Sequence, residues 1–169
     1  MMKMFGGVMI VAVSLWLGMK GMNWYRRRCR VLSELIHAIS RMEAELSGRE
    51  TETAELLKLL GRGESETARL FRACSNDLEA LEERPFREIW LEELNESRLP
   101  LKGEERETAE RLGHVLGRYD SGLQTRLLEG LRCELEELLS AAREESAREG
   151  KCALTVSGCV GLLLVLLLI

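Results

Sequence analysis

An all-α fold is predicted for this chain of 169 residues, and three features of the sequence predict it. The charged residues are segregated: all 28 acidic residues and every basic residue except Lys3 lie between Lys20 and Lys151, which leaves two apolar ends. Within residues 26–151, 23 leucines stand against five isoleucines and valines, and leucine favours helices whereas β-branched residues favour strands. Glycine, proline and serine divide this segment at intervals typical of short helices.

The amino-terminal end, residues 4–25, is predicted to be a transmembrane helix. Residues 4–19 carry no charge. Lys20 can extend its ammonium group to the lipid–water interface, where Trp24 and Tyr25 also fit, so the helix is long enough to cross a bilayer. A cleaved signal peptide is the alternative. Retention is favoured because no A-x-A-like cleavage site follows and the next residues are strongly basic.

The carboxyl-terminal end, residues 152–169, is predicted to be a second transmembrane helix. Its last eight residues are apolar on every face, which disfavours a buried helix of a soluble core. A GPI-anchor signal is disfavoured because it requires a polar spacer and a small-residue cleavage site. Ser14 with Gly18, and Ser157 with Gly161, are pairs of small residues four positions apart, which would let the two spans pack closely against each other. The alternative is that these glycines have no packing role, because glycine is common in membrane helices.

Basic residues that follow the first span predict its orientation. By the positive-inside rule they place residues 26–151 in the cytoplasm. These residues are Lys20, Arg26, Arg27, Arg28 and Arg30. Residues 20–151 contain 23 basic and 28 acidic residues, a net charge of −5, so the basic cluster indicates topology and contact with anionic lipid rather than nucleic-acid binding. The prediction is therefore a six-helix cytoplasmic bundle flanked by N- and C-terminal transmembrane helices.

Capping residues and helix breakers predict the helices of the bundle. These helices occupy about residues 30–46, 52–60, 66–81, a segment from Pro85 to Leu94, residues 104–116 and residues 121–149. Thr51 and Ser65 are the expected N-caps of the second and third helices, and Pro85 is expected in the first turn of the fourth. The last helix is expected to continue into the second span without a break except near Gly150.

Apolar residues recur three and four positions apart in these helices, which predicts the faces that form the core. The expected core residues are Leu32, Leu35, Ile36, Ile39, Met42 and Leu46 in the first helix; Leu70, Phe71, Cys74, Leu78 and Leu81 in the third; and Phe86, Ile89, Trp90 and Leu94 in the fourth. The last helix carries a coiled-coil-like seam of Leu128, Leu131, Leu135, Leu138 and Ala142. This seam spans too few heptads for a dimer and is expected to pack within the bundle.

No motif for nucleotide binding, zinc proteolysis or hydrolase chemistry occurs in the sequence. Pairs of adjacent glutamates point in different directions on a helix, so they are expected to be solvated faces rather than catalytic dyads. The five cysteines lack C-x-x-C spacing, and with His37 and His114 as the only histidines they form no metal-ligand grouping. No catalytic, cofactor or metal site, and no small-molecule substrate, is therefore predicted.

The stretch Leu112-Gly113-His114-Val115-Leu116-Gly117-Arg118-Tyr119-Asp120-Ser121-Gly122-Leu123-Gln124 is the most distinctive short sequence of the chain. Capping explains its composition: Gly117 can close one helix in the left-handed region, and Asp120 can accept hydrogen bonds from the first amides of the next. Gly113 would let another helix approach closely. The interpretation favoured is structural, and the alternative is a partner contact. The candidate residues are Leu112, Gly113, Leu116, Gly117, Asp120 and Gln124.

This LGxxLGxxDxxxQ pattern between two helices resembles the stage III sporulation protein AB family. Other matches follow in order along the whole chain: the glycine-containing spans, RVLSELIHAISRMEAEL after a basic flank, Leu70-Phe71, and Trp90 in the fourth helix. The family usually has Thr-Pro-Leu between the first two helices, whereas Thr51 is followed here by Glu52 and Thr53. The helical domain is also similar to cytoplasmic domains of the inner-membrane platform proteins of type II secretion and type IV pilus systems.

The resemblance implies a non-enzymatic membrane component of the transenvelope complex between mother cell and forespore, located in the mother-cell membrane. It also implies partners: an ATPase of the stage III sporulation protein AA family and other membrane proteins of the stage III complex. The alternative is a membrane-bound enzyme or regulator with a site assembled from distant residues, of which His114, Asp120 and Glu110 are the nearest candidates. A small pore-former is disfavoured because both spans have few polar residues.

Overall fold

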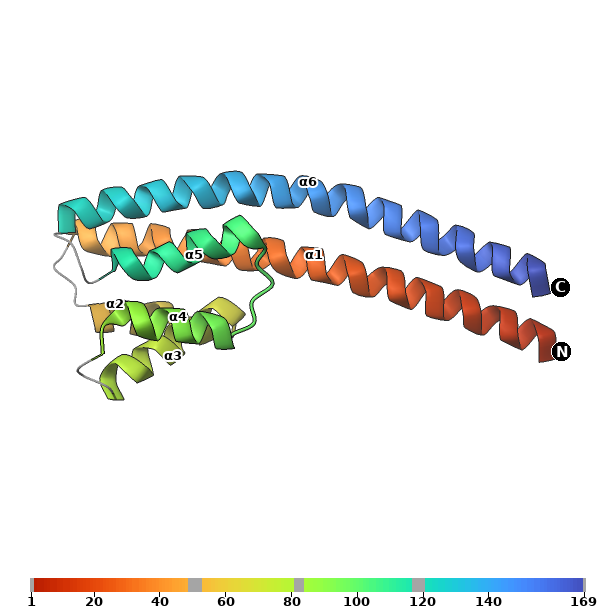
Figure 1. The fold of residues 1–169 in the computed structure, drawn as a ribbon, viewed down its shortest axis with the longest axis horizontal. Helices are drawn as coiled ribbons and strands as arrows, with labels where there is room; N and C mark the ends of the chain where they lie inside the picture. Colours follow the sequence, from red (N-terminus) through yellow and green to blue (C-terminus); the bar gives the residue numbers. More distant parts are fainter. Residues whose placement is uncertain (1, 49–52, 81–83, 117–120, 169) are drawn as a thin grey trace. The chain divides into compact units, whose positions relative to one another are not determined.

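The structure is a computed structural model that describes the backbone of residues 2–48, 53–80, 84–116 and 121–168. Side chains are described for residues 21–46, 53–80, 84–116, 122–149 and 155. This part of the chain forms six helices and no strand (Figure 1), which confirms the all-α prediction. The helices are α1 (Met2–Gly48), α2 (Thr53–Leu60), α3 (Glu66–Ala80), α4 (Phe86–Glu96), α5 (Gly103–Val115) and α6 (Ser121–Leu168).

The chain divides into two compact units, and both boundaries fall inside the long helices α1 and α6. Unit 1 comprises Met1–Cys29 and Ser140–Ile169, and unit 2 comprises Arg30–Leu139. In unit 1 the beginning of α1 and the end of α6 run side by side (Figure 1). An ion pair of 2.6 Å joins them, from Arg28 Nη1 to Glu145 Oε2.

The core of unit 2 is built on the apolar stripe of α1, as the sequence predicts. Its buried members are Val31, Leu32, Leu35, Ile36, Ala38, Ile39 and Met42. Ion pairs at the edges of the core join α6 to α1 and to α5. Arg132 Nε of α6 lies 3.2 Å from Glu43 Oε1 of α1, and Arg111 Nη1 of α5 lies 2.7 Å from Glu134 Oε2 of α6. Helix α6 is therefore bound to both α1 and α5 within unit 2.

The short helices α2, α3, α4 and α5 pack in sequence order, each against the next. Ser65 caps α3 as predicted, because its Oγ accepts a hydrogen bond of 3.1 Å from the Ala68 amide. The guanidinium of Arg72 on α3 donates to the Gly61 carbonyl at the end of α2, at 2.9 Å from Nη2, and so binds a carbonyl that the helix leaves unpaired. The predicted cap Thr51 lies outside the described residues.

Four details of the sequence interpretation are corrected by the structure. Leu139, not Leu138, continues the buried seam of α6: Leu139 is 7% exposed and Leu138 is half-buried, although at about 100° per residue both lie at about the same angle from the mean direction of the stripe. Leu46 and Leu78 are half-buried, since each lies near the end of its helix. Pro85 is the N-cap of α4 rather than a first-turn residue. Helix α6 continues through Gly150 without a break.

In the predicted spans, residues 4–25 and 152–169, the side chains of residues 21–25 and 155 are described and the others lie outside the described part of the chain. Their backbone is helical in α1 and α6. Among the residues that the structure describes, no helix is long and apolar enough to cross a membrane.

Candidate functional site

Trp90 of α4 is the centre of the packing between the short helices. Its side chain is fully buried, with 0% of its surface exposed. The ring lies 5.5 Å from that of Phe71 on α3 and 6.1 Å from that of Phe86 on α4, between ring centroids. Its indole Nε1 donates a hydrogen bond of 2.8 Å to the Ala109 carbonyl of α5. The indole therefore contributes both apolar contact and a polar anchor, which is how buried tryptophans are usually held.

Gly113 is the residue of α5 that lets α4 approach this closely. A Cβ atom placed on Gly113 would lie 2.4 Å from Cδ1 and 2.8 Å from Cγ of Trp90, well inside van der Waals contact. The predicted close approach of another helix at Gly113 is thereby confirmed, and the approaching helix is α4. The first glycine of the distinctive stretch is thus required by core packing.

The other candidate residues of this stretch separate into two groups. Leu112 and Leu116 are buried at the end of α5, with exposed fractions of 1% and 3%, and Gln124 is buried near the start of α6. Helix α5 ends at Val115, and Leu116 has an extended backbone while its amide still donates to the Leu112 carbonyl at 3.2 Å. Gly117 and Asp120 lie outside the described residues, so their expected capping roles stay predictions.

Two of the three residues named for an enzymatic site, Glu110 and His114, lie one turn apart on α5. Glu110 Oε1 is 3.0 Å from Arg106 Nε, so its carboxylate is paired within α5. His114 is half-buried on the same helix. Asp120 lies outside the described residues. Across the described residues, no group of three His, Cys, Asp or Glu side chains is placed to hold a metal ion.

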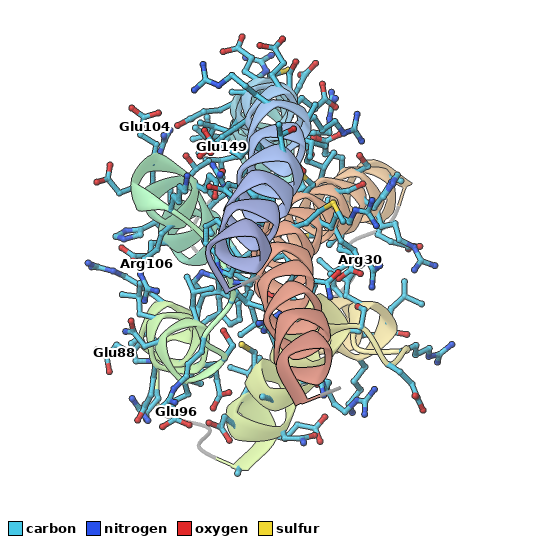
Figure 2. All side chains as sticks on the ribbon, turned by 90° about the vertical axis from the view of Figure 1, so that its right-hand side faces the viewer. Arg30, Glu88, Glu96, Glu104, Arg106 and Glu149 are labelled. Carbon is cyan, nitrogen blue, oxygen red and sulfur yellow. The ribbon has the colours of Figure 1, made fainter. Side chains whose placement is uncertain are left out.

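A groove of about 580 Å³ opens beside Gly113, between the start of α4 and the end of α5. The first two turns of α4 form one wall, and the end of α5 forms the other. We call this feature the α4–α5 groove. It is lined by Pro85, Phe86, Arg87, Glu88, Leu91, Gly113, His114 and Leu116. Figure 2 shows Glu88 of α4 and Arg106 of α5 pointing outward on the same side of the two helices.

Sequence reasoning identified one wall of this groove and missed the other. The α5 wall belongs to the distinctive glycine-containing stretch. The α4 wall is formed by Arg87, Glu88 and Leu91, which alternate with the core residues of α4 and carry no motif of their own. Pro85 was the available signal, because a proline at the start of an amphipathic helix fixes where its first turn projects.

Most arginines around the groove are paired with acidic side chains. Arg84 Nη2 lies 2.8 Å from Glu92 Oε2, and its Nε lies 3.9 Å from Glu88 Oε2. Arg106 is paired with Glu110 within α5, and Arg111 of α5 is paired with Glu134 of α6. Arg87 is exposed and lines the groove, and among the described residues it has no acidic partner. A ligand in the groove therefore meets the positive charge of Arg87.

A second electrostatic feature lies where α3 meets α4. Burial raises the pKa of the Glu93 carboxyl, and the neighbouring charge of Asp77 on α3 raises it further. Burial also raises the pKa of the Cys74 thiol to about 12, with smaller contributions from Glu93 and Asp77. Cys74 is therefore a protonated core residue at neutral pH, and the raised pKa makes the Glu93 carboxyl easier to protonate in the folded protein than in the unfolded chain.

Replacing Glu93 by Gln is expected to stabilise the protein slightly at neutral pH. A raised folded-state pKa gives stability that is fully present below the unfolded pKa of about 4.3 and is lost as the pH rises through the folded value. At neutral pH the carboxylate is thus unfavourable, and because the side chain is only half-buried and screened by solvent, its removal should add only about 0.3 kcal/mol. Thermal unfolding measured by circular dichroism should show this gain near neutral pH and a smaller gain in acid. Glu129→Gln, at an exposed position of α6, is the matched control and should leave the melting temperature nearly unchanged.

The sequence matches known proteins along nearly its whole length. The model of the family described as stage III sporulation protein AB matches residues 3–169. Stage III sporulation protein AB of Bacillus subtilis (strain 168) is 28% identical over 179 residues, covering 99% of each chain. A solved structure of stage III sporulation protein AB has a TM-score of 0.64 and 23% identity, and covers 72% of this chain and 97% of that one. At that identity the structural likeness establishes the fold alone.

Proposed function

Because the chain belongs to the stage III sporulation protein AB family, we propose that it is a non-enzymatic, membrane-anchored platform component of the transenvelope complex between mother cell and forespore. Membership of the family gives the chain a role in sporulation. The family match over residues 3–169 is the observation that carries the proposal, because it includes both apolar ends and the helical domain between them. In this role the domain docks a cytoplasmic secretion-type ATPase of the stage III sporulation protein AA family.

Anchoring in the membrane is supported by the distribution of charge along the chain. Residues 4–19 and 152–169 are uncharged, and five basic residues follow the first stretch. Such a pattern is typical of two membrane helices with the segment between them in the cytoplasm. The mother-cell membrane that surrounds the forespore is the location that the family implies.

A docking role, rather than catalysis, is supported by how the charges of unit 2 are used. Arginines and glutamates on the outer faces of α4, α5 and α6 pair with one another across and along helices, as in Arg111 with Glu134. Pairs of this kind give a surface a fixed pattern of charge that a partner can match. They also leave Glu110, a candidate of the enzymatic alternative, paired with Arg106.

Labelling of Cys133 tests the topology. Cys133 is exposed on α6 and Cys74 is buried, so a membrane-impermeant maleimide should modify the former readily and the latter hardly at all. For the chain expressed in vegetative cells, where its membrane would be the cell membrane, the expected result is labelling in inverted membrane vesicles, whose cytoplasmic face is outside, and protection in intact protoplasts. Cys133→Ser is the control that identifies the labelled site. Labelling of intact protoplasts at Cys133 would place the domain outside the cytoplasm and overturn the docking proposal.

Co-purification tests the partner. A tagged chain, solubilised from sporulating cells in mild detergent, is expected to retain the stage III sporulation protein AA ATPase through washing. A variant that lacks residues 53–116, the short helices α2 to α5, is expected to reach the membrane and to lose the ATPase. If the full chain repeatedly fails to retain the ATPase, the platform proposal is wrong.

A further inference from the structure

The α4–α5 groove has the dimensions and the lining of a small docking site. Its volume of about 580 Å³ is in the range of sites that enclose several side chains or a small ligand. The apolar part of its lining comes from Phe86, Leu91 and Leu116. These side chains are held by the fold, because Phe86 packs on Trp90 and Leu116 is almost fully buried. An apolar group that enters the groove therefore meets a formed surface.

The charge at the edge of the groove selects the kind of occupant. Glu88 forms an ion pair with Arg84, with 3.9 Å between Glu88 Oε2 and Arg84 Nε, so the negative charge of Glu88 is partly compensated. Arg87 has no acidic partner among the described residues and is exposed. A guanidinium in this position can bind a carboxylate through two hydrogen bonds, and arginine is enriched at protein interfaces for that reason. An apolar surface beside an exposed arginine is complementary to an apolar side chain beside a carboxylate.

We propose that the α4–α5 groove receives an acidic segment of the cytoplasmic partner, with an apolar side chain against Phe86, Leu91 and Leu116 and a carboxylate on Arg87. The inference rests on the proposed docking function and assigns that function to one surface of unit 2. It also gives Gly113 a second role. The packing of Trp90 against Gly113 sets the distance between α4 and α5, and that distance sets the width of the groove.

Substitution of Arg87 tests the assignment with little risk to the fold, because the side chain is exposed. The full chain, in nanodiscs, is titrated with the purified stage III sporulation protein AA ATPase. Arg87→Glu is expected to weaken binding by about ten-fold or more, because it places two carboxylates face to face. Arg87→Lys keeps the charge but loses the second hydrogen bond to the carboxylate, so it is expected to weaken binding by less than Arg87→Glu does and by more than the control. Arg69→Glu is the matched control: Arg69 is exposed on α3, away from the groove, and should change binding by less than about two-fold.

Each outcome decides the question. If the unchanged chain, Arg87→Glu and Arg69→Glu bind the ATPase with equal affinity, the assignment of the groove is wrong and the docking function still stands. Equal weakening by both charge reversals would also overturn it, since the effect would then reflect overall charge. A doubled mass for the unchanged chain that Arg87→Glu abolishes would reassign the groove to self-association. If the unchanged chain does not bind the ATPase, the proposed function fails and the groove assignment fails with it.

Discussion

Gly113→Ala is expected to lower the melting temperature of the protein by roughly 5–10 °C. The added Cβ would lie 2.4 Å from Trp90 Cδ1 and 2.8 Å from Cγ. Trp90 is fully buried, and the clashing atoms lie near its backbone, so neither the ring nor its χ angles can move away cheaply. Helices α4 and α5 must separate, which also stretches the Trp90–Ala109 hydrogen bond. Overpacking together with the weakened hydrogen bond costs about 2–4 kcal/mol.

Gly130→Ala is the matched control for this prediction. Gly130 is the tenth residue of α6, inside the helix, and a Cβ placed there would meet nothing within 4 Å. Alanine is the better helix former, so this variant is expected to gain up to about 1 kcal/mol. Circular dichroism of the full chain in detergent micelles measures both changes. The clash also predicts non-additivity: Gly113→Ala should cost little in a Trp90→Ala background. Equal melting temperatures for Gly113→Ala and Gly130→Ala would contradict the packing described here.

The position of each short helix could be predicted from the sequence because local signals suffice for it. Ser65 caps α3 through its own hydroxyl, and a glycine follows α2 directly at Gly61. The buried face of α1 could be predicted equally well, since Leu32, Leu35 and Ile39 recur at helical spacing. These features depend on residues within a few positions of one another in the sequence, so they can be predicted without knowing which helices contact each other.

Partners across helices could not be predicted, because periodicity identifies a buried face and leaves open what covers it. The sequence indicates that Gly113 permits a close approach and that Trp90 belongs to a core, but it does not pair the two. The same limit explains the groove. Arg87 and Leu91 became part of a candidate site only when α4 was placed beside the end of α5. The seam of α6 shows a smaller version of this limit, since Leu138 and Leu139 fit the helical spacing equally well and only the packing of α6 shows that Leu139 is the buried residue.

Trp90, Gly113 and the groove together connect the core of unit 2 with its proposed docking surface. The indole holds α4 against α5 on one side, and Phe86 contacts both that indole and the groove. A change in the core should therefore alter partner binding without touching the partner. Gly113→Ala is expected to weaken ATPase binding as well as stability, whereas Arg87→Glu is expected to weaken binding alone.

Glu145→Ala is expected to have the second largest effect, and it acts in unit 1. Glu145 Oε2 lies 2.6 Å from Arg28 Nη1, and only 8% of the Arg28 side chain is exposed. Removing the carboxylate leaves a guanidinium buried without this partner, although its position 5.9 Å from the centre of the Trp24 ring gives it some compensation. Because the Glu145 side chain is 30% exposed, the pair is only partly desolvated, so the cost should be about 2 kcal/mol. The melting temperature of the full chain in micelles should fall by roughly 4–8 °C.

The charge swap and a neighbouring pair separate the ion pair from other effects of the substitution. Arg28→Glu combined with Glu145→Arg restores opposite charges and is expected to recover more than half of the loss, which neither single reversal can do. Glu149→Ala is the matched control, because Glu149 lies one turn further along α6 and its contact with Arg148 is 3.8 Å long and exposed. An exposed pair of this kind contributes at most about 0.5 kcal/mol. If Glu145→Ala and Glu149→Ala melt at the same temperature, the Arg28–Glu145 pair does not hold α1 and α6 together in unit 1.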